Sequence, residues 1–211
     1  MPLDTHFFGD KMRKFSGLIL VGLLITISSA TTGAPKELGI LYGQWQPLNL
    51  TTQTTASLFQ GIADTSPYFA LFFNTHIAKG IYLQQTIGFW NQKKVKILWI
   101  QSVLIIPFYL NIKHRLVEKS PLSPFVSYGA GLLLGIENHQ TGTIPTTNTE
   151  TTQATQLGFE FNISTGIDVT IYRHLGLNLS FCYCYAKFPQ KLGETDDYTG
   201  SRATVGIFYV F

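Results

Sequence analysis

The longest two-sided pattern in the chain is a strict alternation of apolar and polar side chains between residues 156 and 172. From Leu157 onward every second residue is Leu, Phe, Phe, Ile, Thr, Ile, Val or Ile, whereas the intervening residues include Gly, Glu, Asn, Ser and Asp. Successive side chains of a β-strand point to opposite faces, so the pattern predicts a two-faced strand. It is longer than the usual strand of about five or six residues. It suits the roughly nine to eleven residues that cross a bilayer at a tilt.

Seven further segments have strand-like composition, and several of them alternate as cleanly. Between residues 175 and 185, Leu, Leu, Leu, Phe, Tyr and Tyr face one way, and Gly, Asn, Ser, Cys and Cys face the other. The first segment, which contains GILYGQWQ, does not sort into two faces. The eight predicted strands are residues 38–48, 66–78, 80–91, 95–112, 122–137, 155–172, 175–188 and 199–211.

The connections between these segments alternate in length. Short turns at residues 78–80 and 172–174 and a polar segment at 113–121 lie on one side of the meander. Long polar loops are predicted on the other side at residues 49–65, 138–154 and 189–198, although 91–94 is brief. Outer-membrane barrels have short periplasmic turns and longer outer loops. The pattern therefore predicts an all-β fold, an eight-stranded antiparallel up-and-down transmembrane β-barrel with both termini in the periplasm. A soluble eight-stranded barrel or sandwich is the alternative.

The N-terminal region has the composition of an export signal. Arg13 and Lys14 precede an apolar stretch at residues 17–27, and the small residues Ser28 and Ala30 follow it. This order is typical of a Sec-type signal peptide. We predict a signal peptide in residues 1–30, with Met12 as a candidate start, and an outer-membrane barrel domain in residues 31–211. A retained membrane anchor is the alternative interpretation.

Composition favours one exported membrane domain without spanning helices. The chain has 211 residues, of which only 13% are charged, against about 25% in typical soluble domains. Residues 95–112 are the nearest candidate for a transmembrane helix, but they carry Lys96, Gln101, Pro107 and Asn111 among many β-branched and aromatic residues. This composition favours a strand. The net charge of +3 argues against a nucleic-acid partner.

The C-terminal segment TVGIFYVF places Val205, Ile207, Tyr209 and Phe211 on one face. It resembles the assembly signal by which the barrel-assembly machinery recognises outer-membrane proteins. Together with SPFVSYGAGLLLG (residues 123–135) and GIDVTIYRHLGLNLSF (166–181), it is similar to the small outer-membrane β-barrel family, which includes OmpX-, OmpW- and OmpA-type eight-stranded barrels. The resemblance covers nearly the whole mature chain. It implies location in a Gram-negative-type outer membrane.

Strand parity assigns a set of polar side chains to the barrel lumen: Glu137, Glu160, Asp168, His76, Asn74 and Arg202. An unpaired buried carboxylate costs several kcal/mol. We therefore expect Arg202 to pair with Glu160 or Glu137. This cluster is expected to be a structural plug in a filled barrel, because eight strands leave little internal space. A gate or small-solute path is the alternative. Inward-facing Gly129, Gly131 and Gly135 would make room for bulky neighbours.

An enzymatic role is not predicted. Lipid A deacylases carry a His-x-Ser pair near their penultimate hairpin, whereas the corresponding segment here, SFCYCYAK (residues 180–187), has Cys182 and Cys184 and no such pair. A catalytic cysteine would need a nearby base, and the sequence offers none. The histidines are scattered, so no metal or other cofactor is expected. The two cysteines are expected to be free, because neighbours two apart on a strand lie at the limit of disulfide reach.

Charged and aromatic residues near the strand ends suggest contacts with the membrane surface. Lys93, Lys94, Lys96 and Lys187 lie at the predicted outer end and could meet lipopolysaccharide phosphates. A solvated rim is the alternative. Candidate girdle aromatics, of which some must instead pack inward, are Trp45, Trp90, Trp99, Tyr109, Tyr128, Tyr183 and Tyr185.

The sequence as a whole predicts a structural or surface-interaction barrel with a largely filled polar lumen. The Thr-rich segment HQTGTIPTTNTETTQATQ is one candidate for surface adhesion, although its ligand is not identified. The expected partners are outer-membrane lipid, lipopolysaccharide and the barrel-assembly machinery. A narrow channel for small or apolar solutes, as in OmpW-type proteins, is the runner-up, and a lipid A-modifying enzyme comes third.

Overall fold

The computed structural model describes residues 36–50, 66–96, 99–117, 120–141 and 150–211. The predicted signal peptide, residues 1–30, lies outside the described residues, as do most of the first outer loop and the centre of the Thr-rich segment. Within the described ranges, no helix is long and apolar enough to cross a membrane.

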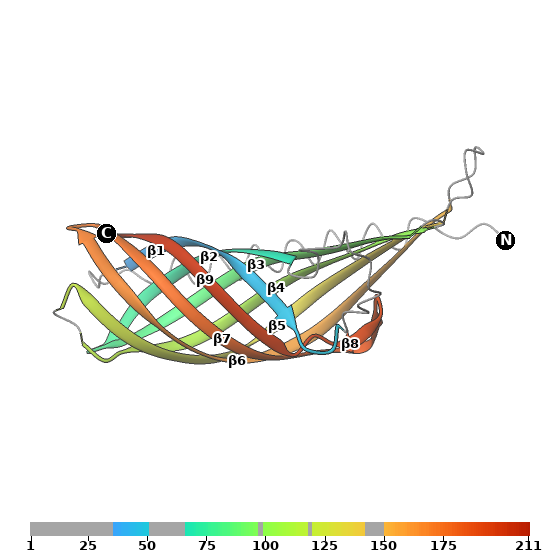
Figure 1. The fold of residues 1–211 in the computed structure, drawn as a ribbon. Helices are drawn as coiled ribbons and strands as arrows, with labels where there is room; N and C mark the ends of the chain where they lie inside the picture. The colour runs from blue at the N-terminus through green and yellow to red at the C-terminus, as the bar shows by residue number, and fades with distance from the viewer. Residues whose placement is uncertain (1–35, 51–65, 97–98, 118–119, 142–149) are drawn as a thin grey trace. The chain divides into compact units, whose positions relative to one another are not determined.

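The described residues form one antiparallel sheet that closes on itself (Figure 1). Each of eight strands pairs with two neighbours, in the order β1-β2-β3-β4-β5-β6-β7-β9 and back to β1. The predicted eight-stranded antiparallel barrel is therefore confirmed. The strands are β1 (Lys36–Pro47), β2 (Ser66–Ala78), β3 (Ile81–Lys96), β4 (Trp99–Arg115), β5 (Leu122–Thr141), β6 (Glu150–Tyr172), β7 (Leu175–Leu192), the short β8 (Thr195–Asp197) and β9 (Gly200–Val210).

The seam of the ring joins its first and last strands. β1 and β9 pair from Glu37 with Val210 to Pro47 with Gly200. Beyond the ladder, the backbone N–H of Lys36 donates to the carbonyl of Phe211 at 3.2 Å, and the N–H of Phe211 donates back at 2.9 Å. Closure leaves no free edge along the seam, as a membrane-spanning sheet requires.

Alternating side chains give the barrel an apolar outer wall and a filled interior. In β6, Phe161, Ile163 and Ile167 are exposed, whereas Glu160, Asn162 and Asp168 are buried. The four C-terminal residues predicted to share a face all point outward. This exposed apolar wall is the surface expected of a barrel in lipid.

Several predicted strands were too short at the outer end of the barrel, whereas the fourth, predicted from residue 95, begins only at Trp99. β3 continues to Lys96 rather than ending at 91, and β5 and β6 extend into the predicted loop 138–154. β7 also runs to Leu192, and β8 forms within the predicted loop 189–198. Polar residues continue these strands because backbone pairing persists beyond the apolar wall. The predicted tight turns after β2 and β6 are confirmed, the first with Gly80 at φ 70°.

The outer ends of β3 to β6 continue beyond their ring neighbours and form a four-stranded sheet, named here the outer extension. It consists of residues 91–96, 99–104, 136–141 and 150–158. β2 pairs with β3 only as far as Trp90, and β7 pairs with β6 only as far as Phe159. The outer extension thus has one edge on β3 and another on β6 (Figure 1).

Candidate functional site

The lumen near the turn end of the barrel is filled by four charged side chains, named here the basal ion cluster: Glu37, Lys113, Arg115 and Asp168. The Arg115 guanidinium donates to both carboxylate oxygens of Glu37, at 2.5 and 2.8 Å. It also donates through Nε to Asp168 at 2.7 Å. A planar guanidinium suits such two-sided bridging between carboxylates. Arg115 therefore ties together β1, β4 and β6.

Further polar and aromatic contacts complete the basal ion cluster. The Lys113 ammonium lies 2.7 Å from Asp168 and 4.0 Å from the centre of the Phe125 ring. Asn178 donates to Asp168 at 2.7 Å, and Asn74 donates to Glu37 at 2.8 Å. Two cations face two carboxylates, so the cluster has no formal net charge. Its geometry suits a structural plug.

A second ion pair, Arg202 with Glu160, lies further along the lumen and is named here the central ion pair. Arg202 on β9 contacts Glu160 on β6, and the two side chains are 2% and 0% exposed. Of the two carboxylates expected as partners for Arg202, Glu160 is the one in contact. Three aromatic rings surround the guanidinium, with centroids 5.0 to 5.1 Å from its carbon: Trp45, Tyr68 and Tyr109.

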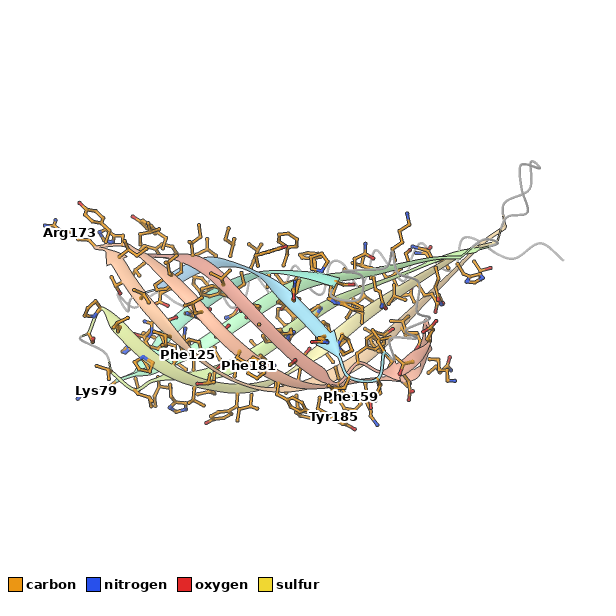
Figure 2. All side chains as sticks on the ribbon, viewed as in Figure 1. Lys79, Phe125, Phe159, Arg173, Phe181 and Tyr185 are labelled. Atoms are coloured by element: carbon orange, nitrogen blue, oxygen red, sulfur yellow. The ribbon has the colours of Figure 1, made fainter. Side chains whose placement is uncertain are left out.

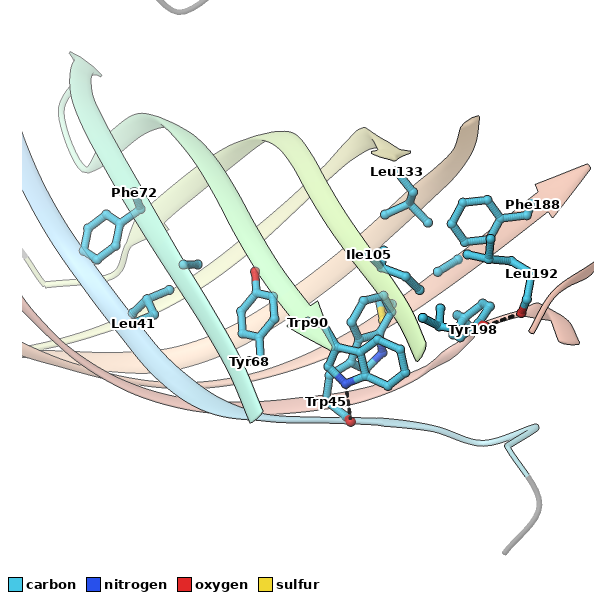
Figure 3. Packing of buried hydrophobic residues seen from close by; sticks show 14 of the residues in the cluster. Leu41, Trp45, Tyr68, Phe72, Trp90, Ile105, Leu133, Phe188, Leu192 and Tyr198 are labelled. Carbon is cyan, nitrogen blue, oxygen red and sulfur yellow. Dashed lines mark hydrogen bonds between the residues drawn. The ribbon is translucent and has the colours of Figure 1, made fainter. Parts of the chain in front are cut away.

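The outer mouth of the lumen is filled by apolar side chains, named here the mouth plug: Trp45, Trp90, Ile105, Leu133, Phe188, Leu192 and Tyr198 (Figure 3). The Tyr198 ring stands edge-on to Trp90 and to Phe188, with centroids 5.8 and 5.6 Å apart. The Tyr198 hydroxyl donates to the carbonyl of Leu192 at 2.5 Å. Phe188, Leu192 and Tyr198 belong to the β7–β8 hairpin and the residue after it. This hairpin therefore closes the mouth from within.

Glu137 holds the turn of that hairpin rather than pairing with Arg202. One Glu137 oxygen accepts the backbone N–H of Gly193 at 2.7 Å, and the other accepts the Gln101 amide at 2.6 Å. Gly193 has φ +69°, which suits glycine in a two-residue hairpin turn. Gly135 makes room for the hairpin, since a Cβ there would collide with the Leu192 side chain.

Little space remains in the mouth. A hollow lined by Gln92, Gln101, Val103, Gly193 and Tyr198, among others, has a volume of about 10 Å³. That is close to the least volume in which one water molecule fits. The plug, the central ion pair and the basal ion cluster thus follow one another along the lumen.

The remaining residues that the sequence assigned to the lumen or to the outer rim, His76 and four lysines, lie in different environments. His76 is half-buried and edge-on to Tyr82, at 5.1 Å between centroids, and Tyr82 in turn lies against Arg115. Lys187 lies 3.9 Å from Asp197 on β8. Partial burial acts to raise the pKa of Asp197, but hydrogen bonds from Thr199 and the Lys187 ammonium hold it below the ordinary value. The Lys93 side chain is exposed, and the backbones of Lys94 and Lys96 lie in β3.

The candidate girdle aromatics divide between the two faces of the wall. Tyr128, Tyr183 and Tyr185 are exposed on the outer wall, and Figure 2 shows Tyr185 beside Phe159. Trp45, Trp90 and Tyr109 are instead buried in the lumen, because their strand parity is that of the inward face. Trp99 belongs to β4, and its side chain is outside the described set.

Three members of the basal ion cluster were missed by the sequence prediction. Glu37 precedes the predicted start of the first strand, and that segment did not sort into faces. Lys113 and Arg115 were assigned to a turn, whereas β4 continues to Arg115. Lys113 and Arg115 follow Asn111 by two and four residues. Strand alternation, continued from Tyr109 and Asn111, would therefore have placed both cations on the inward face.

Among the residues that the structure describes, the cysteines and other potential ligands form no recognisable metal centre. Cys182 and Cys184 are free, and the Cys184 thiol donates to the carbonyl of Gly200 at 3.4 Å. Across the described part of the chain, no group of three His, Cys, Asp or Glu side chains could hold a metal ion.

The closed ring, the apolar outer wall and the filled polar lumen define a small outer-membrane β-barrel protein. The solved structures that share the fold are bacterial outer-membrane barrels, and each of the three described below covers 85% of the chain.

The first is Ail, the attachment invasion locus protein of Yersinia pestis, with 14% identity, a TM-score of 0.52 and all of that chain covered. The second is a major outer membrane protein from Thermus thermophilus, with 10% identity, a TM-score of 0.54 and all of that chain covered. Ail in complex with the heparin analogue sucrose octasulfate matches with a TM-score of 0.50 and 14% identity, over 85% of this chain and all of that one. At such identities the likeness concerns the fold. No protein-family model and no curated protein matches the chain.

Proposed function

We propose that the protein is a closed outer-membrane barrel whose outer extension binds polyanionic sugars at the cell surface. The observation that carries the proposal is the outer extension itself. β5 and β6 have 20 and 23 residues, whereas about nine to eleven suffice to cross the bilayer. β1 and β9, with 12 and 11 residues, are close to that length. Four strands therefore rise into the space outside the membrane.

A filled lumen supports a surface role over a channel. The mouth plug, the central ion pair and the basal ion cluster occupy successive levels of the lumen, so solute passage would require at least three groups of side chains to move. We assign no chemistry to these groups.

The lysines of β3 indicate the chemical class of the ligand. Lys93, Lys94 and Lys96 belong to the part of β3 that has no β2 neighbour. Lysine ammonium groups form charge-assisted hydrogen bonds with phosphate and sulfate oxygens. Lipopolysaccharide phosphates and sulfated glycans both carry such oxygens. Ail was crystallised with a heparin analogue, a sulfated sugar, which agrees with this class.

The proposal is tested by replacing Lys93, Lys94 and Lys96 together with Gln in the refolded full-length barrel. We expect weaker binding to heparin and to lipopolysaccharide aggregates, with a smaller dependence on salt, because each lost contact contributes about 1 kcal/mol near a charged surface. Binding is measured by retention on immobilised heparin and by titration of lipopolysaccharide.

A matched control removes three cations from the opposite end of the barrel, with Lys36→Gln, Lys79→Gln and Arg173→Gln. This variant should bind both polyanions as the unchanged protein does. Equal loss of polyanion binding in the two variants would show that the ligands respond to the net charge of the protein, and it would contradict the proposed site. Loss of lipopolysaccharide binding alone would narrow the ligand to phosphorylated sugars.

A second variant tests the outer extension as a whole. Glu137 faces Ala154 across the β5–β6 ladder, so residues 138–153 can be replaced by the two-residue turn Asn-Gly. The trimmed barrel keeps every strand of the ring. We expect it to fold, as judged by its heat-dependent electrophoretic mobility, and to bind polyanions more weakly. Unchanged binding would restrict the site to β3 and the adjoining rim.

A further inference from the structure

We draw no further inference here: the strongest candidate, the apolar hollow of about 390 Å³ on the lipid-facing wall across β7, β9, β1, β2 and β3, carries none because nothing in the structure shows what covers it.

Discussion

Arg202 shows how the lumen tolerates charge at the level of a single residue. Its guanidinium is almost completely buried, and it has one carboxylate partner and three aromatic neighbours. Cations over ring faces gain up to about 2 kcal/mol when desolvated. The rings therefore supplement the carboxylate, but they cannot replace it, because an unpaired buried charge costs more.

Glu160→Gln should accordingly destabilise the barrel by about 3–5 kcal/mol, because it leaves the Arg202 charge buried without a counterion. The measurement is urea unfolding in lipid vesicles, followed by tryptophan fluorescence. The exposed Asp196→Asn should stay within about 0.5 kcal/mol of the unchanged protein. Replacing both partners, with Arg202→Met and Glu160→Leu, should cost less than Glu160→Gln alone. A single variant as stable as the starting protein would contradict this account of the pair.

Strand parity predicted many of the side chains that face the lumen, but not Arg115, which bridges two carboxylates there. Glu160, Asp168, Asn74 and Arg202 sit within long alternating runs, so their inward direction could be inferred from neighbours. Arg115 sits at a strand end, where alternation has too few residues to be recognised. Its role depends on the meeting of β1, β4 and β6, and spacing in one segment does not contain that information.

At the level of elements, the β7–β8 hairpin decides whether the mouth is open. Its turn is held by Glu137. Its side chains Phe188 and Leu192 belong to the same buried cluster as Trp90, Leu133 and Ile105. Its apolar contacts lie inside the ring, whereas its polar residues Lys191 and Asp196 are exposed. The hairpin is therefore amphipathic, and its orientation follows from that division.

Glu137→Ala should loosen the hairpin turn without unfolding the barrel. The Gly193 N–H would lose its acceptor, and an unsatisfied group of this kind costs about 1–3 kcal/mol. We expect hydrogen exchange at the Gly193 amide to accelerate about tenfold or more, and trypsin to cleave sooner after Lys191. Asp196→Ala, on the exposed side of the same hairpin, is the control and should change neither. Unaltered exchange in Glu137→Ala would mean that packing alone holds the turn.

The sequence predicted which segments become strands better than where they end. Membrane-facing alternation identifies the central part of each strand, because lipid imposes it. Beyond the lipid, the residues of β5 and β6 are polar on both faces, and hydrophobic periodicity disappears while pairing continues. β8 was missed for the same reason, since its three residues are stabilised by the neighbouring β7 and not by a pattern of their own.

For the molecule as a whole, the mouth plug, the central ion pair and the basal ion cluster block the lumen at three successive levels. We therefore expect a barrel without measurable ion conductance. In planar bilayers, neither the unchanged protein nor Arg202→Ala should give discrete openings, because the mouth plug and the basal ion cluster remain in the variant. A large porin in the same bilayer serves as the positive control. Openings in the unchanged protein that are altered by Arg202→Ala would instead support the narrow channel.

The hydrogen-bonded seam between β1 and β9 also affects the order of events in folding. Every other neighbouring pair in the ring, apart from β7 with β9, is joined by one connection and can form as a local hairpin. The seam brings together residues from the two ends of the described chain, so it carries the largest loop-closure entropy and is expected to form late. Once it has formed, Lys36 and Phe211 are direct neighbours. A short linker between them would let the ring start at an outer loop instead of at the turn end, and a permuted chain of that kind should reach the same barrel.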